Sequence, residues 1–319
     1  MKLGIVSDSL SRLSTDEVIK TAAELGLTRI EFATGNWSTA PHLNLEALLA
    51  SASARSELKS KLSDYGLSIS ALNANGNQLH PGESGIKHAE CVDKSIQLAS
   101  LLEVENVVMM SGLPAAPGDS YPNWIVCAWP PETQVILEHQ WDVAKSYWQG
   151  LSQVARERDV KLCIELHSQQ LVYNLPSFYR LRDITGDIVG INLDPSHILW
   201  MGGDPIALIR EAGNMIYHVH AKDTYIDRYN RATTSALDNR PMTMSRERSW
   251  SYVTLGYGQP EDWWKEFCYT LAHFSNPELT LSIEHEDMNL SCMEGVKKSV
   301  ELLHRTAMFE SSDYQLPAI

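Results

Sequence analysis

The stretch Met215–Asp223, MIYHVHAKD, has the alternating pattern of a buried β-strand whose two faces differ. Successive side chains of a strand point to opposite faces, so His218 and His220 lie on one face and Val219 lies on the other. This stretch therefore predicts a strand that carries imidazoles on one side of a sheet.

Three other stretches follow the same plan, each with an acidic residue near its C-terminal end, on the face opposite the aliphatic residues. They are Lys161–His167 (KLCIELH), Val189–His197 (VGINLDPSH) and Leu279–Asp287 (LTLSIEHED). Four strands that point these ends at one place would supply three carboxylates and one imidazole to a divalent metal ion. The predicted ligands are Glu165, Asp194, His220 and Glu284.

Eight strand patterns alternate with helical patterns along the chain. This alternation predicts a parallel sheet, and eight units over roughly 300 residues is the number found in a (β/α)8 barrel. An open doubly wound sheet is the alternative, but the first strand-to-helix turn, Ser7–Ser14, has no GxGxxG fingerprint. We therefore predict a single (β/α)8 TIM barrel over residues 1–309, followed by a loose tail over residues 310–319.

Two long connections interrupt the regular rhythm. Leu113–Pro131, after the fourth strand, is rich in proline and tryptophan, and Thr224–Gly258, after the seventh strand, contains five arginines. Loops of this length inside a compact domain are usually functional, so we expect them to cover or reshape the mouth of the barrel. The arginines are compatible with a phosphate or acidic substrate, a solvated loop or a subunit interface.

Composition excludes several classes of function. The 319 residues carry a formal net charge of −14, which argues against bulk electrostatic binding to nucleic acid or to an anionic membrane. No stretch approaches the ~20 apolar residues of a membrane span. The five cysteines are scattered without a CxxC pair, which favours a reducing cytoplasm.

A buried carboxylate must be paired or metal-bound, because an isolated buried charge is very costly. We expect no inward Lys or Arg from the four strand ends, since we place Lys222 off the inward face. A divalent cation is then a simpler counter-charge than an ion-pair network. Carboxylates with one imidazole and no thiolate favour Mn²⁺ first, with Mg²⁺ or Co²⁺ as alternatives.

The motifs IELH, LDPSH, HVHAKD and SIEHED resemble those of the xylose isomerase-like TIM-barrel superfamily, over roughly residues 2–304. Within it, ketose 3-epimerases and inosose dehydratases use a Glu–Asp–His–Glu metal set. The resemblance implies the same role for the four predicted ligands. It also implies that Glu165 and Glu284 form the acid/base pair, and that His197, three residues after Asp194, touches the substrate.

Further residues near these strand ends are candidate substrate ligands. Together with His197 they are His167, Lys222, Asp223, Asn75 and Trp124. His167 and Asp223 could orient a ligand or a substrate hydroxyl, and Lys222 could be an electrophile or an exposed charge. Turn chemistry explains Asn75 equally well, and packing is the usual role of a residue such as Trp124.

The expected function is a divalent-metal-dependent sugar isomerase or epimerase that abstracts a proton next to a carbonyl, through a metal-stabilised enediolate. The alternative is a metal-dependent lyase or dehydratase that acts on an inosose or a 3-keto-glycoside. An endonuclease of abasic DNA needs more histidines and a basic face, and a non-catalytic sugar-binding barrel is the remaining possibility. We expect a small sugar or sugar derivative as partner, and the long loops would suit a homo-oligomer interface.

Overall fold

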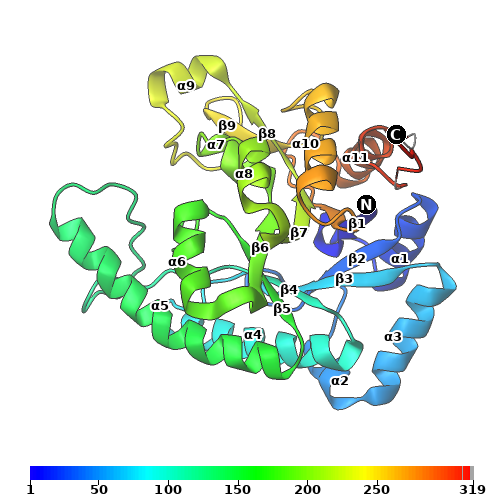
Figure 1. Cartoon of the computed structure of the whole chain (residues 1–319), viewed down its shortest axis with the longest axis horizontal. Helices are drawn as coiled ribbons and strands as arrows, with labels where there is room; N and C mark the ends of the chain where they lie inside the picture. The colour runs from blue at the N-terminus through cyan, green and yellow to red at the C-terminus, as the bar shows by residue number, and fades with distance from the viewer. Residues whose placement is uncertain (311, 317–319) are drawn as a thin grey trace.

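The computed structural model describes residues 1–310 and 312–316, in which eight parallel strands form a closed barrel (Figure 1). Their order around the barrel is β1-β10-β7-β6-β5-β4-β3-β2. The strands are β1 (Lys2–Val6), β2 (Arg29–Ala33), β3 (Ser68–Asn73), β4 (Asn106–Met109), β5 (Lys161–Glu165), β6 (Val189–Leu193), β7 (Ile216–Ala221) and β10 (Thr280–Ile283). The predicted TIM-barrel fold is confirmed, and the four polar strand ends lie at one end of it.

Helices surround the strands. They are α1 (Thr15–Glu24), α2 (Leu45–Ala50), α3 (Ala52–Asp64), α4 (Glu83–Leu102), α5 (Glu132–Glu157), α6 (Leu175–Thr185), α7 (Pro195–Trp200), α8 (Pro205–Ala212), α9 (Arg228–Thr234), α10 (Glu261–Phe274) and α11 (Cys292–Thr306). None of the helices among the described residues is long and apolar enough to cross a membrane. The N-terminal ammonium donates a 2.7 Å hydrogen bond to the Met308 carbonyl, so the end of the chain returns to its beginning.

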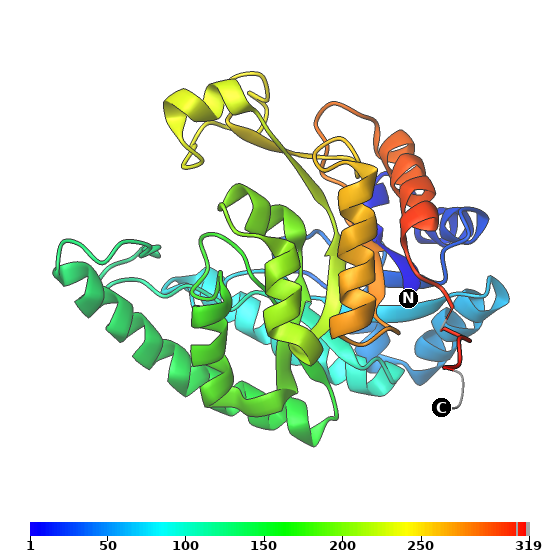
Figure 2. The same cartoon turned by 45° about the horizontal axis from the view of Figure 1, so that its top comes forward.

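The second long connection is largely ordered as a projecting arm. β8 (Asp223–Ile226) pairs antiparallel with β9 (Trp250–Val253), and α9 lies at the far end of this hairpin (Figure 2). Residues 113–131, the first long connection, contain an isolated bridge between Ala115 and Pro122. The tail beyond Glu310 has no helix or strand in its described residues, 312–316, and the predicted tail residues 311 and 317–319 lie outside the described part.

Most arginines of the arm serve the arm itself. Arg248 is buried, and its guanidinium donates to the backbone carbonyls of Trp250 and Arg240. Arg240 forms an ion pair with Asp238 at 3.2 Å, and the Arg228 guanidinium lies over the ring of Tyr229. These contacts give the arginines a structural role in the arm.

Gly190 of β6 marks a close contact on the barrel wall. A Cβ atom at this position would lie 2.1 Å from the ring of Tyr217 on β7, far inside van der Waals contact. We expect Gly190→Ala to lower the free energy of unfolding by about 1–3 kcal/mol, because the ring must shift to admit the methyl group. Urea denaturation of Gly190→Ala, Tyr217→Ala and the double variant measures this. If the clash is the cause, the double variant loses less free energy of unfolding than the two single variants together. An additive loss would show that the clash is not the cause.

Candidate active site

The four predicted ligands come together at the carboxyl ends of four strands. One potential ligand atom from each of Glu165, Asp194, His220 and Glu284 lies within 4.8 Å of the others. Nδ1 of His220 is 3.2 Å from Oε2 of Glu165 and 3.1 Å from Oε2 of Glu284. The site is therefore a compact set of three carboxylates around one imidazole nitrogen.

Two potential metal-ligating atoms of this set are buried and have no hydrogen-bond partner among the described residues. They are Oδ2 of Asp194 and Nδ1 of His220. Oδ1 of Asp194 is already engaged, since it accepts a 2.8 Å hydrogen bond from the Ser196 amide at the start of α7. Buried polar atoms are normally paired. Both residues belong to the set whose ligand atoms lie within 4.8 Å of one another. The donor set therefore fits a divalent cation with oxygen and nitrogen ligands.

Amide side chains hold Glu165 in place. Its Oε2 accepts 3.1 Å hydrogen bonds from Asn75, which follows β3, and from Asn192 on β6. Burial opposes ionisation, but His197 and His220 lower the pKa of Glu165 well below its usual value. The structure thus places Asn75 beside the site, where it orients a carboxylate that is ionised.

Glu284 has a different environment from Glu165. Its side chain is 17% exposed, against 2% for Glu165, so it lies nearest to the opening of the site. Burial raises the pKa of Glu284, although Lys222 and His220 oppose this shift. The pKa values of the two glutamates are therefore shifted in opposite directions, as in pairs of carboxylates that divide acid and base roles.

The expectation that no basic side chain points inward is wrong. Lys222 is buried, with its ammonium 2.7 Å from Glu286, 3.3 Å from Glu284 and 3.7 Å from Asp194. The physical reason is simple: residues two apart on an extended strand point to the same side, so Lys222 follows His220 inward. Part of the negative charge of the site is thus neutralised by the chain itself, and the ammonium faces the space where a substrate would lie.

An aromatic wall supports the other side of the site. Nε2 of His197 lies 3.0 Å from Glu165 and 3.2 Å from Asp194, and its Nδ1 is 2.9 Å from the hydroxyl of Tyr252 on the arm. The ring centroids of His167 and His197 lie 4.1 Å apart. Burial lowers the pKa of His167 to about 4, so this imidazole is neutral. His167 and His197 thus both border the site, and their predicted contact with a substrate stays a prediction.

A pocket of about 200 Å³ opens onto this cluster. The candidate residues that line it are Asn75, Glu165, His167, Lys222 and Glu284. Asp8, Trp37 and Ser38 also line the pocket, and Ser38 donates a hydrogen bond to Asp8. Asp8 and Ser38 were not predicted, because each follows a strand as a single short polar residue that turn chemistry also explains.

Asp223 does not line this pocket. Its buried carboxylate accepts hydrogen bonds from the backbone amides of Thr224, Gly256, Gly258 and Gln259 at 2.8–3.2 Å. Those amides belong to both ends of the arm. Because its oxygens are occupied in this way, Asp223 closes the arm onto the barrel, and the structure does not favour the substrate contact that we predicted for it.

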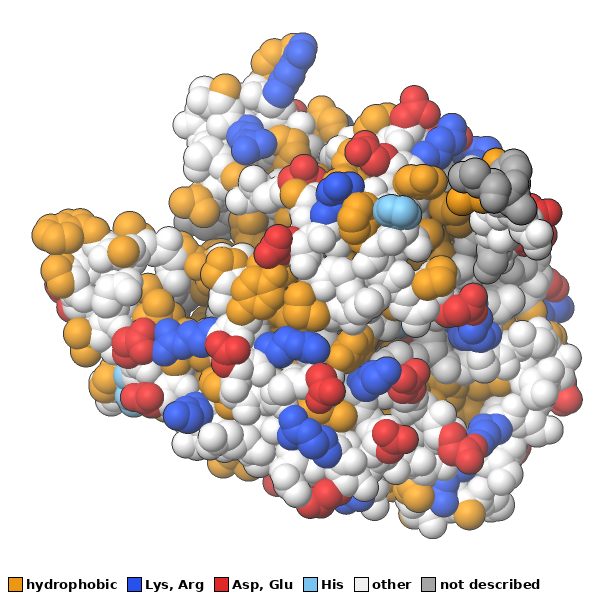
Figure 3. All heavy atoms as spheres, in the orientation of Figure 1, with side chains coloured by type: hydrophobic (Ala, Val, Ile, Leu, Met, Phe, Trp, Pro, Cys, Tyr) orange, Lys and Arg blue, Asp and Glu red, His pale blue; other side chains and the backbone are white. Residues whose placement is uncertain are grey.

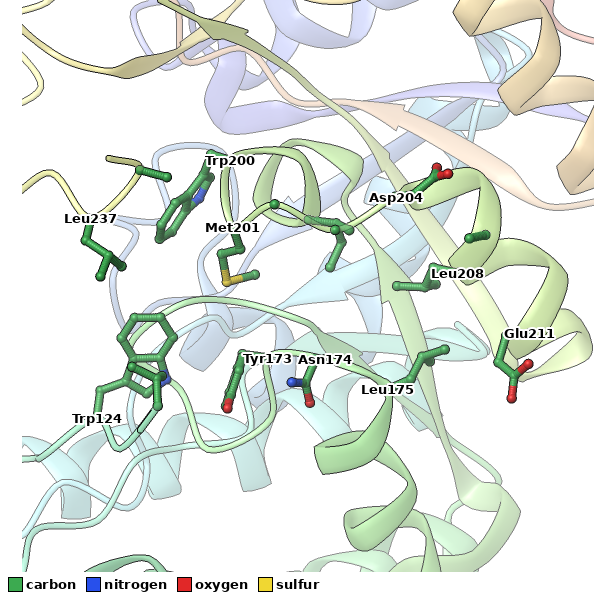
Figure 4. Close-up of a pocket in the computed structure, with 16 residues that line it drawn as sticks. Trp124, Tyr173, Asn174, Leu175, Trp200, Met201, Asp204, Leu208, Glu211 and Leu237 are labelled. Carbon is green, nitrogen blue, oxygen red and sulfur yellow. The ribbon is translucent and has the colours of Figure 1, made fainter. Parts of the chain in front are cut away.

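Trp124 also lies away from the acidic pocket. It lines a separate groove of about 720 Å³ between the first long loop, α7 and α8, where its ring meets Tyr173 edge-on at 5.4 Å (Figure 4). Trp200 lines the same groove and stacks on Trp250 of the arm. Figure 3 shows apolar side chains gathered around this hollow, while acidic and basic side chains are intermixed over the neighbouring helices. Contact between Trp124 and a substrate at the acidic cluster is therefore not favoured.

One residue beneath the site escaped sequence analysis. Glu31 of β2 is fully buried, and its oxygens lie 2.7 Å from Nε2 of His218 and 3.0 Å from Nε2 of His220. Burial opposes ionisation, but the two imidazoles lower the pKa of Glu31 well below its usual value. The signal was present, since Glu31 stands alone between Ile30 and Phe32 and so points away from them.

Comparison with known proteins gives a family-level match over most of the chain. Residues 19–306 match a family model described as xylose isomerase-like TIM barrel. A protein of Bacillus subtilis (strain 168), named YfiH and described as uncharacterized, is 46% identical over 311 residues, covering 96% of this chain and 99% of that protein. An inosose dehydratase of Clostridium tetani is 31% identical over 94 residues, covering 29% of this chain and 31% of the relative.

Solved structures share the fold at low sequence identity. The probable 3-DHS dehydratase AsbF of Bacillus anthracis superposes with a TM-score of 0.68 at 17% identity, covering 95% of this chain and 99% of that one. The IOLI protein with a bound zinc atom superposes with a TM-score of 0.67 at 18% sequence identity, covering 97% of this chain and 100% of that one. An L-ribulose 3-epimerase superposes with a TM-score of 0.63 at 16% sequence identity, covering 96% of this chain and 94% of that one.

Proposed function

Because this chain belongs to the xylose isomerase-like TIM-barrel family, we propose that it is a divalent-metal-dependent sugar isomerase or epimerase. Proteins similar to it are named as epimerases and dehydratases, so an enzyme of carbohydrate chemistry is the class that the relatives support. The observation that carries the proposal is the position of Glu165 and Glu284, on either side of an unpartnered nitrogen of His220.

The residues that would hold the cation are Glu165, Asp194, His220 and Glu284. We propose Mn²⁺ as the preferred ion, with Mg²⁺ or Co²⁺ as alternatives, because oxygen ligands predominate. A protein of similar fold, the IOLI protein, binds a zinc atom, which supports the proposal of a metal in this chain. When bound, such an ion polarises a substrate carbonyl and stabilises the negative charge that develops during proton removal.

The protein's own residues divide the proton transfer between them. Glu165, whose pKa is lowered by His197 and His220 against the effect of burial, accepts the proton from the carbon next to the carbonyl. Glu284, whose pKa is raised by burial, returns a proton from another side. Removal on one face and return on the other inverts the carbon centre, which is epimerisation, and return to the neighbouring carbon gives isomerisation.

Substrate contacts are proposed for the polar side chains around the pocket. Lys222 and His197 face the cluster directly, and neutral His167 offers a ring nitrogen for a sugar hydroxyl. Asn75 lines the pocket and would fix Glu165 during the reaction. The pocket of about 200 Å³ suits one small sugar unit.

A lyase or dehydratase is the second candidate, and the position of Lys222 favours it. Elimination needs an acid that protonates the departing oxygen, in addition to the base that removes the proton. The Lys222 ammonium lies 3.3 Å from Glu284 and would stabilise the departing oxygen as a hydrogen-bond donor. An inosose or a 3-keto-glycoside is the proposed substrate of this alternative.

A reducing compartment fits the cysteine chemistry. Cys91, Cys127, Cys163, Cys268 and Cys292 are all free thiols in the structure. We therefore propose a cytoplasmic location.

Metal content and solvent exchange test the proposed function together. We expect about one equivalent of metal in the purified protein by mass spectrometry, because the proposed site consists of one four-residue set, Glu165, Asp194, His220 and Glu284. EDTA should lower the melting temperature, and Mn²⁺ or Co²⁺ should restore it, since a ligand that binds only the native state stabilises it.

Ketoses and 3-keto-glycosides are then incubated in D₂O with the metal-loaded protein. Proton NMR should show deuterium at one carbon and an epimer or isomer of otherwise unchanged composition. Release of water or of an aglycone would identify the lyase instead. If the protein contains no metal, shows no thermal shift and catalyses no deuterium exchange, the proposed function is wrong.

A further inference from the structure

A second buried carboxylate lies directly beneath the metal-ligand set. Glu31 comes from β2, on the far side of the barrel from the strands that supply most of the ligands, yet its Oε1 reaches Nε2 of His220 at 3.0 Å. Both side chains are inaccessible to solvent. The contact therefore joins an ionised carboxylate to the one imidazole in the proposed ligand set.

This contact decides which nitrogen of His220 is available to a cation. A carboxylate only accepts hydrogen bonds, so Nε2 of His220 must carry a proton to pair with Glu31. In the neutral ring the other nitrogen, Nδ1, then carries the lone pair. It is Nδ1 that points at Glu165 and Glu284 and has no hydrogen-bond partner.

Glu31 is itself held from several sides. Its Oε2 accepts a 2.7 Å hydrogen bond from His218, and its Oε1 also accepts a 2.8 Å hydrogen bond from Nδ2 of Asn73. The β2–β3 pairing shifts register between Ile30 and Glu31, a bulge of the kind that re-aims a side chain. The carboxylate has therefore little freedom to turn away from His220.

We propose that Glu31 is a positioning residue that fixes the tautomer and ring orientation of His220, and thereby sets the affinity of the site for its metal ion. The proposal rests on the proposed metal centre. The competing interpretation is a second metal site, because atoms of Glu31, His218 and His220 also lie within 4.8 Å of one another. Here, however, the nitrogens that face Glu31 already donate to it, so they offer no lone pair to a cation.

Glu31→Gln tests the proposal, because the amide keeps the size of the side chain but provides one neutral acceptor for two imidazoles. We expect the affinity for Co²⁺ and Mn²⁺, measured by titration calorimetry, to fall about 10–100-fold, the usual effect of removing such a partner. The visible absorption bands of bound Co²⁺ should also change, because the His220 ring is no longer held in one orientation.

Cys163→Ala is the matched control. Cys163 is equally buried on β5, and the only hydrogen bond of its side chain among the described residues goes to Asn106. We expect its metal affinity to stay within about 3-fold of the wild type, since it touches neither Glu31 nor the ligands through a hydrogen bond. Circular dichroism of both variants reports whether they are folded.

The outcomes separate this proposal from the proposed function. A folded Glu31→Gln variant with wild-type affinity overturns the positioning role alone. A wild-type protein that binds no cation removes the metal centre and this proposal together. Two equivalents in the wild type and one in Glu31→Gln would establish the second metal site instead.

If Glu31→Gln does not fold, NMR of the wild type decides. In ¹⁵N-histidine-labelled protein loaded with Zn²⁺, one ring should retain a protonated Nε2 and bind the metal through Nδ1. The resonance is assigned by its loss in His220→Asn. A metal-bound Nε2 at this ring would overturn the proposal.

Discussion

Glu165→Gln is expected to abolish both metal binding and catalysis. The change removes one ligand oxygen's charge and the proposed base while it keeps the shape that Asn75 and Asn192 recognise. We expect metal affinity to fall more than about 100-fold, beyond the effect of losing an outer partner, and kcat/KM to fall by about 10²–10⁴-fold or more. Glu284→Gln should behave in the same way.

Metal stoichiometry by mass spectrometry and initial rates on the identified substrate measure this prediction. Glu278→Gln is the matched control, because the Glu278 side chain is 64% exposed and pairs with Lys2, the first residue of β1. We expect that control to retain metal and activity. Full activity in both Glu165→Gln and Glu284→Gln would show that the cluster is a structural ion network.

Trp148→Ala is expected to cause the largest loss of stability. This side chain of α5 is 1% exposed, and its indole N–H donates a 3.1 Å hydrogen bond to the carbonyl of Ser111, just beyond β4. Removing it leaves a large cavity and an unpaired carbonyl. We expect the free energy of unfolding to fall by about 3–5 kcal/mol, measured by urea denaturation.

Two further variants separate the causes of that loss. Trp148→Phe keeps most of the buried ring but loses the donor, and should cost about 1–3 kcal/mol. Tyr121→Ala, at a side chain that is 73% exposed, should change stability by less than about 0.5 kcal/mol. A Trp148→Ala variant as stable as Tyr121→Ala would mean that α5 does not anchor the barrel wall.

The fold was predictable because its signals are local and repeated. The predicted alternation of eight strands with helices is present in the barrel, and Ser14 and Glu17, a capping-box pair that can be read in the sequence, cap α1. The strand ends were predictable because one rule, an acid opposite aliphatic residues, applies to several strands in turn. A TIM barrel places such ends around a single mouth.

The errors have equally local causes. Residues 44–65 have the pattern of one continuous helix, but the chain breaks where Ser51 caps α3 by accepting a hydrogen bond from the Ala54 amide. The helix α7 was missed because six residues are too few to show a helical period. The pairing of β8 with β9 depends on contact between segments that are far apart in the sequence.

The site was predictable only where its residues end a strand. Tyr252 reaches His197 from the arm, and nothing in an arginine-rich connection marks it as part of a site. Glu31 was not predicted because we looked for acidic residues at the ends of strands, and Glu31 lies in the middle of β2. Lys222 was misplaced by a miscounted alternation, and a consistent count would have predicted its inward position.

The closure of the arm by Asp223 has an evolutionary consequence. Both ends of the inserted hairpin are gathered at one carboxylate, which lies three residues after His220. The length and sequence of the insert can therefore vary without transmitting strain to the strand below. Tyr252 of the insert nevertheless contacts His197, so the insert reaches the candidate active site. Such an arm can change in length or sequence, and so alter the side chains beside His197, while the strand ends of the barrel keep their positions.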